Sequence, residues 1–515
     1  MPEDENREIL NTLAKGAGIT AFGMFASKFF TYLYRALVGR ALGPEAYGQL
    51  SIGMMIVGIG ITLAGGPVRN GLKKFIPEYR EKEDLASIKG VILSALGINL
   101  VGSIFIGGVI FFSAEILANQ VFNTPDLVPI IRGFAVVPLL SRFYNTFIDV
   151  TIAYNTARYK VITTNFFQNI VQLLVTAALI LLAGMGVMGA VWGWIAGVFF
   201  AGILAFYFME RKLGPILTSR EKPNFQYGKL IKYSYPLILS GIMGILQGWV
   251  DTAFLGYYMD SAAVGLYNAA YPTAVLILLP EKALGTLTLS SFSTQGAREG
   301  DQGMMLKTTA RWVFMFTFPS FLIMSLFSGE LLHLLFGSQY TQAGLALSIL
   351  ALGNLAASST GHIADLLKSK GYTRAIFYNN FSNLILNVIL NILLIPHLGI
   401  VGAAVATASS NIFVNILLAG ETWRYEKINP FSKKIFKTLI SGLLSLGITY
   451  LIFEQLSSPA PYWILVPAGI VFFSLYALIL LKIGGLTDYD KEIIHTVGRK
   501  TGWEKEVRKL VNILT

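Results

Sequence analysis

The sequence contains no cysteine and unusually few charged residues. The absence of cysteine excludes disulfides, thiolate metal sites and cysteine nucleophiles, and the four histidines lie far apart along the chain. Charged residues make up 13% of the 515 residues, about half of the roughly 25% that is usual in soluble domains. Hydrophobic residues make up 54%, and the mean hydropathy is +0.61. With 13% aromatic residues, this composition excludes soluble, fibrous and disordered chains and predicts an all-α polytopic membrane protein.

The apolar residues gather into long uninterrupted stretches. A helix needs about 20 residues to cross the hydrocarbon core of a bilayer, and fourteen stretches of this chain are long enough. The fourteen predicted membrane-spanning helices cover residues 14–39, 46–69, 89–113, 127–154, 161–183, 187–209, 233–256, 262–290, 308–328, 343–366, 375–396, 399–421, 437–455 and 462–482.

Lysine and arginine are distributed unevenly among the predicted connections. With a cytoplasmic N-terminus, every inner loop is basic, and Arg40 is the only basic residue in the outer loops. The positive-inside rule therefore predicts a multi-pass protein of the cell membrane with both termini cytoplasmic. The N-terminal sequence MPEDENREIL lacks the basic segment of a signal peptide, so the first span is expected to be retained. The net charge of +11 lies along one membrane face and requires no nucleic-acid partner.

Two pairs of segments suggest an internal repeat of six spans. LLAGMGVMGAV (181–191) is similar to LIPHLGIVGAA (394–404), which aligns Gly186 with Gly399. RALVGRALGPEAYGQL (35–50) is similar to TAFLGYYMDSAAVGLY (252–267), which aligns Gly48 with Gly265. Six is an even number of spans, so both halves have the same orientation in the membrane. Repeats of this kind are related by an axis along the membrane normal, and substrate sites lie between them near the midplane.

The repeat predicts two six-helix lobes followed by two further helices. The tail mixes apolar residues with Lys and Arg, a pattern typical either of a helix on the anionic cytoplasmic leaflet or of a solvated helix packed on the inner loops. The expected segments are a cytoplasmic N-terminus (1–13), an N-lobe (14–212), a cytoplasmic linker (213–232), a C-lobe (233–424), two C-terminal spans (437–482) and a cytoplasmic amphipathic tail (483–515).

Three stretches resemble one transporter family. RALVGRALGPEAYG, which begins at Arg35, resembles the end of the first span in polysaccharide flippases of the Wzx type. Phe75-Ile-Pro-Glu-Tyr79 is similar to the first cytoplasmic loop of that family, and GIVGAA from Gly399 is similar to its later spans. These flippases belong to the multidrug/oligosaccharidyl-lipid/polysaccharide (MOP) superfamily, with the MATE drug exporters and lipid II flippases. The resemblance implies a V-shaped, two-lobed transporter that moves a polyprenyl-(pyro)phosphate-linked oligosaccharide outward by alternating access.

Four basic residues within the predicted spans are candidates for binding the phosphate groups of such a substrate. Ionisable groups inside a membrane are costly and indicate function by default. Arg35 and Lys28 lie seven residues apart and share a helix face, and arginine grips phosphate with two hydrogen bonds. Arg142 lies deep in the fourth span, and Lys282 lies in the eighth. The alternatives are ion pairs between helices, or side chains that reach to the membrane surface.

Two carboxylates of the second lobe are candidates for a gate or a coupling-ion site. The repeat aligns Asp251 beside Arg35, so the two residues are candidates for a gate-like ion pair. Alternatively, Asp251 holds a coupling H⁺ or Na⁺. Glu281 is adjacent to Lys282, and because neighbouring helical residues point about 100° apart, at most one of them faces a central cavity.

The alternatives to a flippase are a small-molecule exporter and a membrane enzyme. A MATE-type, cation-coupled exporter of small organic molecules shares the expected fold, but organic cations favour an acidic and aromatic site, whereas the first lobe is basic. A membrane enzyme acting on lipid-linked glycans usually has a large external loop, and the longest outer loops here, around 114–126 and 329–342, are short. The sequence contains no metal-ligand spacing, nucleophile elbow or phosphate loop. We therefore expect a transporter without cofactor or metal, acting on a lipid-linked oligosaccharide among membrane lipids.

Overall fold

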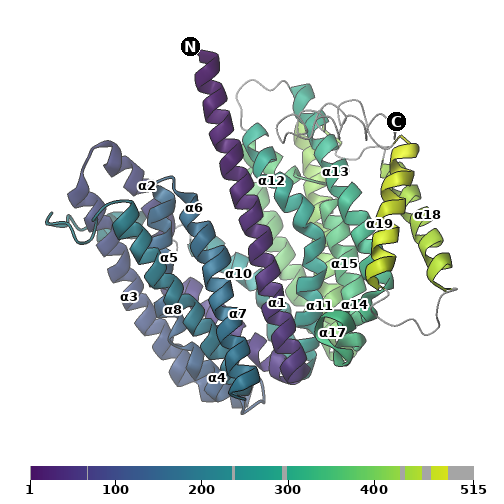
Figure 1. The fold of residues 1–515 in the computed structure, drawn as a ribbon, viewed down its shortest axis with the longest axis horizontal. Coiled ribbons are helices and arrows are strands. Elements are labelled where there is room, and N and C mark those ends of the chain that lie inside the picture. The colour runs from purple at the N-terminus through teal and green to yellow at the C-terminus, as the bar shows by residue number, and fades with distance from the viewer. Residues whose placement is uncertain are drawn as a thin grey trace. The chain divides into compact units, whose positions relative to one another are not determined.

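The structure of the protein is a computed structural model that describes residues 2–65, 68–234, 238–292, 299–429, 435–454 and 465–484. All regular elements within these residues are helices (Figure 1). The predicted amphipathic tail, beyond Gly484, lies outside the described residues. The described residues cluster into two compact units. Unit 1 comprises Met1–Ala269 and Asn391–Ile400, and unit 2 comprises Ala270–Leu390 and Val401–Thr515.

Unit 1 consists mainly of the helices in the first half of the chain. They are α1 (Pro2–Gly65), α2 (Val68–Glu81), α3 (Leu85–Ile116), η1 (Leu117–Val121), α4 (Leu127–Phe134), α5 (Val137–Ala153), α6 (Ala157–Lys160), η2 (Val161–Gln168), α7 (Asn169–Ala177), η3 (Ala178–Leu182), α8 (Gly186–Lys212), α9 (Tyr227–Ser234), α10 (Ile238–Tyr258) and the greater part of α11 (Ser261–Val275). In Figure 1, α2 and α6 lie at the same end of unit 1 as the N-terminus, and α4 lies at the opposite end.

Unit 2 contains most of the remaining helices. They are the end of α11, η5 (Leu276–Leu278), α12 (Leu279–Phe292), α13 (Glu299–Leu326), α14 (Ser328–Phe336), η6 (Ser338–Ala343), α15 (Gly344–Ser358), α16 (Ile363–Ser369), α17 (Thr373–Glu426) apart from Asn391–Ile400, α18 (Ile435–Glu454) and α19 (Leu465–Lys482). The boundary between the units falls within α11, whereas the predicted linker (213–232) lies inside unit 1. The lobe boundaries drawn from the sequence stay a prediction.

Eleven helical segments of the described chain are long and apolar enough to cross a membrane. Each of the fourteen predicted spans overlaps a helix of the structure, although the number of crossings stays a prediction. The eleven segments are Ala26–Gly65, Leu85–Val121, Leu127–Ala153, Arg158–Leu182, Gly186–Lys212, Ser261–Gly285, Gln302–Leu326, Ser338–Ser369, Thr373–Glu426, Ile435–Phe453 and Leu465–Lys482.

The two longest segments each contain a glycine turn where the sequence predicts the end of a span. Gly43 interrupts α1 with φ 80° and ψ 177°, and Gly399 interrupts α17 with φ 56° and ψ −131°. Because L-residues with a side chain rarely adopt positive φ, glycine is the natural residue at both positions. Gly186, which the repeat aligns with Gly399, has a similar φ of 54°. The aligned pair therefore shares a positive φ as well as a sequence pattern.

Helix α2 is fixed in unit 1 by one apolar face. Its buried side chains recur every three or four residues, as expected for an amphipathic helix. They pack with Val91 and Ile92 of α3 and Val150 of α5 into one buried cluster. Arg69 and Lys73 flank this apolar face, on the side of α2 that reaches Asp149 of α5. The buried residues of α2 are Val68, Gly71, Leu72, Phe75, Ile76 and Tyr79.

Candidate functional site

Arg35 lies in a hydrogen-bonded cluster with Tyr47 and Asn268, all within unit 1. Its Nη1 donates to the Tyr47 hydroxyl at 3.1 Å and to the Asn268 carbonyl at 3.5 Å. The Tyr47 hydroxyl is buried and donates to the same carbonyl at 3.2 Å. The Arg35 side chain is only half-buried. The guanidinium is therefore held in a fixed position while part of it stays accessible to a ligand.

Two glycines allow the helices that carry this cluster to meet backbone to backbone. A Cβ on Gly48 would lie 1.6 Å from the carbonyl oxygen of Ser261, at the start of α11. A Cβ on Gly265 would lie 1.9 Å from the carbonyl oxygen of Pro44. The repeat aligns these two glycines with each other, and the structure places them in mutual contact. This close approach brings Tyr47, next to Gly48, within reach of Asn268.

Asp251 is buried in unit 1 beside the Arg35 cluster. Its carboxylate accepts from the Tyr267 hydroxyl at 2.5 Å and from Asn391 Nδ2 at 2.8 Å. Among the described residues no direct ion pair joins Arg35 to Asp251. The two are linked indirectly, because the Asn268 carbonyl accepts from Arg35 while Asn268 Nδ2 donates at 3.1 Å to Thr252, the neighbour of Asp251. The gate or coupling-ion role of Asp251 stays a prediction.

A polar seam along α17 leads to Asp251. It consists of four asparagines spaced by four residues, each at most 5% exposed, and each donates through Nδ2. The asparagines are Asn379, Asn383, Asn387 and Asn391. In the same order, their acceptors are Glu421 at 2.7 Å, Asn411 at 3.3 Å, Thr407 at 3.1 Å and Asp251 at 2.8 Å. The sequence analysis missed this seam, although asparagine at every fourth position of an apolar helix was a visible signal.

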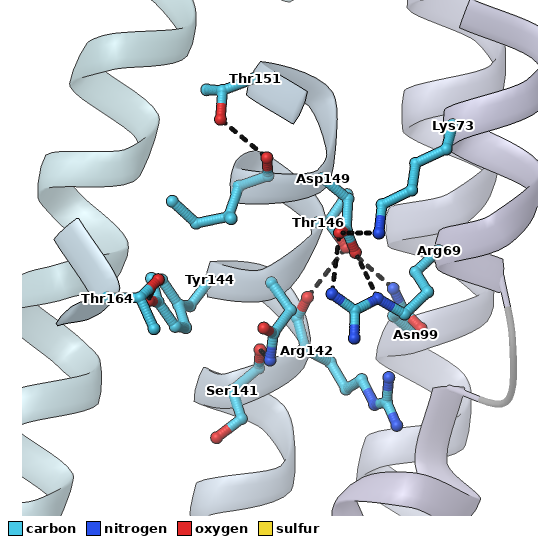
Figure 2. Close-up of polar contacts among 12 residues, drawn as sticks. Arg69, Lys73, Asn99, Ser141, Arg142, Tyr144, Thr146, Asp149, Thr151 and Thr164 are labelled. Atoms are coloured by element: carbon cyan, nitrogen blue, oxygen red, sulfur yellow. Dashed lines mark hydrogen bonds and ion pairs between the residues drawn. The ribbon is translucent and has the colours of Figure 1, made fainter. Parts of the chain in front are cut away.

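A second cluster of charges surrounds Asp149 near the C-terminal end of α5. Arg69, on α2, donates from Nε at 3.2 Å to one carboxylate oxygen and from Nη2 at 3.0 Å to the other. Lys73, one turn further along α2, lies 3.3 Å from the second oxygen. Figure 2 shows both cations pointing from α2 toward the carboxylate. The Asp149 side chain is 1% exposed, whereas those of Arg69 and Lys73 are 45% and 34% exposed.

Arg142 lies on α5 two turns before Asp149 and is 9% exposed. Its Nη2 donates to the Ile61 carbonyl, and its buried Nε has no hydrogen-bond partner. The carboxylate of Asp149 therefore contacts Arg69 and Lys73 rather than Arg142, as Figure 2 shows. Gly65 permits this arrangement, because a Cβ there would lie 2.7 Å from the Arg142 side chain.

The cluster around Asp149 has a net positive charge. Arg142 interacts electrostatically with Arg69 and Asp149, and Lys160, on α6, does so with Arg69, Lys73 and Asp149. Two cations thus contact the carboxylate of Asp149, and two more lie within electrostatic range of it. We name Arg69, Lys73, Arg142 and Lys160 the basic cluster. A net positive cluster with exposed donors is suited to binding an anion such as a phosphate.

The structure places the other candidate residues outside the basic cluster. Lys28 is exposed on α1, where neighbouring residues contact α7 through the hydrogen bond from Asn169 Nδ2 to Ser27. Lys282 is exposed on α12 in unit 2. Glu281 is half-buried, and its backbone carbonyl lies 3.0 Å from His362 Nε2. The substrate and coupling roles of these residues stay predictions.

Arg69 and Lys73 are the basic residues that sequence reasoning missed. It assigned them to the end of the second span and the cytoplasmic loop after it, where basic residues are expected for topological reasons. The available signal was their spacing of four residues, which places them on one face of a helix. Only the docking of α2 on α5 brings that face to Asp149.

The comparison with known sequences identifies the family. The sequence profile of the family described as "Polysaccharide biosynthesis protein" matches residues 37–344. The chain belongs to this family. The resemblance inferred from the segment that begins at Arg35 is thereby confirmed at the level of the family. The chain is also 28% identical over 241 residues to the "Probable low-salt glycan biosynthesis flippase Agl15" of Haloferax volcanii. The match covers 46% of this chain and 51% of Agl15, so the chain spans about half the length of that relative.

Solved structures with the same fold are transporters. The lipid II flippase MurJ in an inward closed conformation has a TM-score of 0.69 at 17% sequence identity, covering 89% of this chain and 98% of MurJ. An inward-facing MATE family transporter of the MOP superfamily has a TM-score of 0.63 at 15% identity, covering 78% of this chain and 94% of that one. At such identities the likeness establishes the fold alone. The chain is therefore a multi-pass, helical membrane protein with the fold of MurJ and the MATE transporters.

Proposed function

We propose that the protein is a flippase that moves a polyprenyl-(pyro)phosphate-linked oligosaccharide from the cytoplasmic to the outer leaflet of the cell membrane. Its family takes part in polysaccharide biosynthesis, and the relative Agl15 is named a probable glycan biosynthesis flippase. The observation that carries the proposal is the basic cluster, in which Arg69 and Lys73 contact the carboxylate of Asp149 and two further cations, Arg142 and Lys160, lie within electrostatic range of it. A structural ion pair would need one cation, whereas an anionic headgroup needs the excess.

The two groups of cations in unit 1 are proposed to act at different depths. With both termini cytoplasmic, the basic cluster lies toward the cytoplasmic ends of the spans, and Arg35 lies toward the outer end of the first. A phosphate in a low-dielectric environment is costly unless cations and hydrogen-bond donors replace its water. The basic cluster would receive the headgroup, and Arg35 would stabilise it later on the way out, with Lys28 on the same helix face. Lys282, on α12, is proposed as a further phosphate-binding residue.

Movement of the substrate against its gradient requires an energy source. We assign this role to Asp251, which would exchange H⁺ or Na⁺, or respond to the membrane potential. The support is its burial together with its polar partners Tyr267 and Asn391. Glu281, half-buried in unit 2, is a second candidate. Transport would stop when the matching gradient is collapsed by a protonophore or by a sodium ionophore.

A reconstituted flipping assay tests the proposal. Purified protein in vesicles is given a lipid-linked oligosaccharide, and an impermeant glycan-cleaving enzyme measures the fraction that reaches the opposite leaflet. Arg35→Ala should lower the initial rate at least tenfold, or about 1.4 kcal/mol. Arg35→Lys should recover only part of the rate, because lysine cannot reproduce a two-point grip on phosphate. The matched control is Arg132→Ala, which removes an exposed arginine paired with Glu115 at 2.7 Å and should leave the rate unchanged.

The second candidate function is a MATE-type, cation-coupled exporter of small organic molecules. It is favoured by the likeness in fold to a MATE transporter and by the buried carboxylate of Asp251. The same vesicles distinguish the two functions. Gradient-driven uptake of cationic dyes, without movement of the lipid-linked oligosaccharide, would replace the flippase by the exporter.

A further inference from the structure

We propose that Asp149 is a displaceable internal counter-ion that occupies the place of the substrate's phosphate in the empty transporter. This inference rests on the proposed function, because it assigns the basic cluster as the loading site for the headgroup. In the empty protein Asp149 holds Arg69 and Lys73 in position. The incoming phosphate or pyrophosphate takes over these two cations and leaves Asp149 as a competitor beside it.

The contacts of Asp149 are those expected of a bound phosphate oxygen pair. Arg69 approaches the two carboxylate oxygens with Nε and Nη2, at 3.2 Å and 3.0 Å. Carboxylate and phosphate are recognised by this same fork of arginine donors. Lys73 adds a point charge at 3.3 Å. The geometry that binds Asp149 is therefore already organised for a phosphate.

The pattern of exposure allows the exchange to take place without unfolding. Asp149 is 1% exposed and sits behind the cations, whereas Arg69 and Lys73 keep 45% and 34% of their side chains accessible. Arg69 uses two of its five N–H donors on Asp149, and Lys73 one of its three. The unused donors belong to side chains that stay partly accessible. A headgroup can thus contact both cations before it displaces the carboxylate.

The surroundings of Asp149 favour an anion of higher charge. Arg142 is nine-tenths buried, and its Nε has no hydrogen-bond partner. A buried donor left unpaired is costly, and a phosphate oxygen near it would remove that cost. Lys160 adds a further positive charge within electrostatic range. One carboxylate neutralises only part of this charge, and a pyrophosphate neutralises more.

A resident competitor also serves turnover. A transporter must bind its cargo firmly enough to load it and weakly enough to release it. When the headgroup leaves, Asp149 re-forms its contacts with Arg69 and Lys73. Its negative charge then compensates the repulsion between the two cations. The ordinary alternative is that Asp149 only fixes α2 to α5. The two roles predict opposite changes in ligand affinity when the Asp149 carboxylate is neutralised. If Asp149 only holds the two helices together, its loss would weaken ligand binding or leave it unchanged, whereas the loss of a competing counter-ion would strengthen it.

Native mass spectrometry with a polyprenyl pyrophosphate, and with the matching polyprenol as the neutral probe, tests the proposal. We expect the wild type to retain the pyrophosphate in preference to the alcohol. Asp149→Asn should bind the pyrophosphate about tenfold more tightly, while its unfolding temperature without ligand falls. The matched control is Asp365→Asn on α16, in unit 2, where the carboxylate pairs with Lys368 at a distance of 3.2 Å. This control should leave the affinity unchanged.

The other possible results distinguish failure of the counter-ion role from failure of the flippase function. Unchanged or weaker pyrophosphate binding by folded Asp149→Asn overturns the counter-ion role but leaves the flippase intact. Equal retention of pyrophosphate and alcohol by all proteins removes the proposed function itself. Should Asp149→Asn fail to fold, Arg69→Lys keeps the charge and removes the two-point grip. It should weaken pyrophosphate binding several-fold, and an unchanged affinity would contradict the proposed geometry.

Discussion

Substitution of Gly48 by alanine should separate two helices that now touch through their backbones. The added Cβ would lie 1.6 Å from the carbonyl oxygen of Ser261, and real Cβ contacts are essentially never shorter than 3.0 Å, so the helices must move apart by at least 1.4 Å (3.0 − 1.6). Overpacking of a well-packed contact costs about 1–3 kcal/mol, and this site belongs at the upper end because both partners are backbone. Alanine recovers about 1 kcal/mol in helix propensity. We expect a net destabilisation of about 2 kcal/mol.

Substitution of a matched glycine, Gly108, should change the stability in the opposite direction. Gly108, inside α3, has nothing within 4 Å of an added Cβ, so Gly108→Ala should stabilise by about 1 kcal/mol through helix propensity alone. Thermal unfolding of the purified protein in detergent measures both variants. Gly48→Ala should also slow flipping, because Tyr47 would lose its position against Asn268. If both substitutions shifted the unfolding temperature equally, the close helix contact at Gly48 would be refuted.

Two further predictions concern the connections between helices of unit 1. Gly90→Ala would place a Cβ 1.7 Å from the carbonyl oxygen of Asn224, so it should release the linker and raise its rate of proteolysis without abolishing folding. Asp84 caps α3 by accepting from the Ser87 amide at 2.9 Å, and hydrogen bonds from Ser87 lower the pKa of Asp84 below its usual value. Since the folded pKa is the lower one, this stabilisation is complete at neutral pH and is lost as the pH falls below about 4. Asp84→Ala should thus destabilise by about 0.5 kcal/mol at pH 7, and the difference from wild type should vanish in acid, as unfolding followed across pH would test.

Most of the helical architecture could be predicted because the bilayer restricts which backbone conformations a chain can adopt. Backbone groups in hydrocarbon must be hydrogen-bonded within the segment, so a long apolar stretch becomes a helix. The turns at Gly43 and Gly399 were visible for a similar reason, since a backbone with positive φ favours glycine. The repeat was visible because aligned glycines such as Gly186 and Gly399 adopt a positive φ in both halves.

The candidate site was only partly predictable. Arg142 and Arg35 could be identified because a charge inside an apolar stretch is conspicuous. Arg69 and Lys73 were not conspicuous, since basic residues at the cytoplasmic end of a span serve orientation in any membrane protein. Likewise, the sequence suggested a direct ion pair between Asp251 and Arg35, but the spacing of aligned positions says nothing of which side chains reach each other.

From the amino-acid sequence alone it follows that this is a polytopic helical membrane protein, and three of its stretches resemble those of polysaccharide flippases. Composition, span length and the positions of glycine suffice for that, because each acts locally or through the membrane. The partners of its buried charges, by contrast, are set by the packing of the helices. Asp149 meets Arg69 and Lys73 because α2 packs its apolar face on α3 and α5 and thereby turns its basic face to the carboxylate. Side chains distant in sequence form such ion pairs only when helix packing brings them into contact.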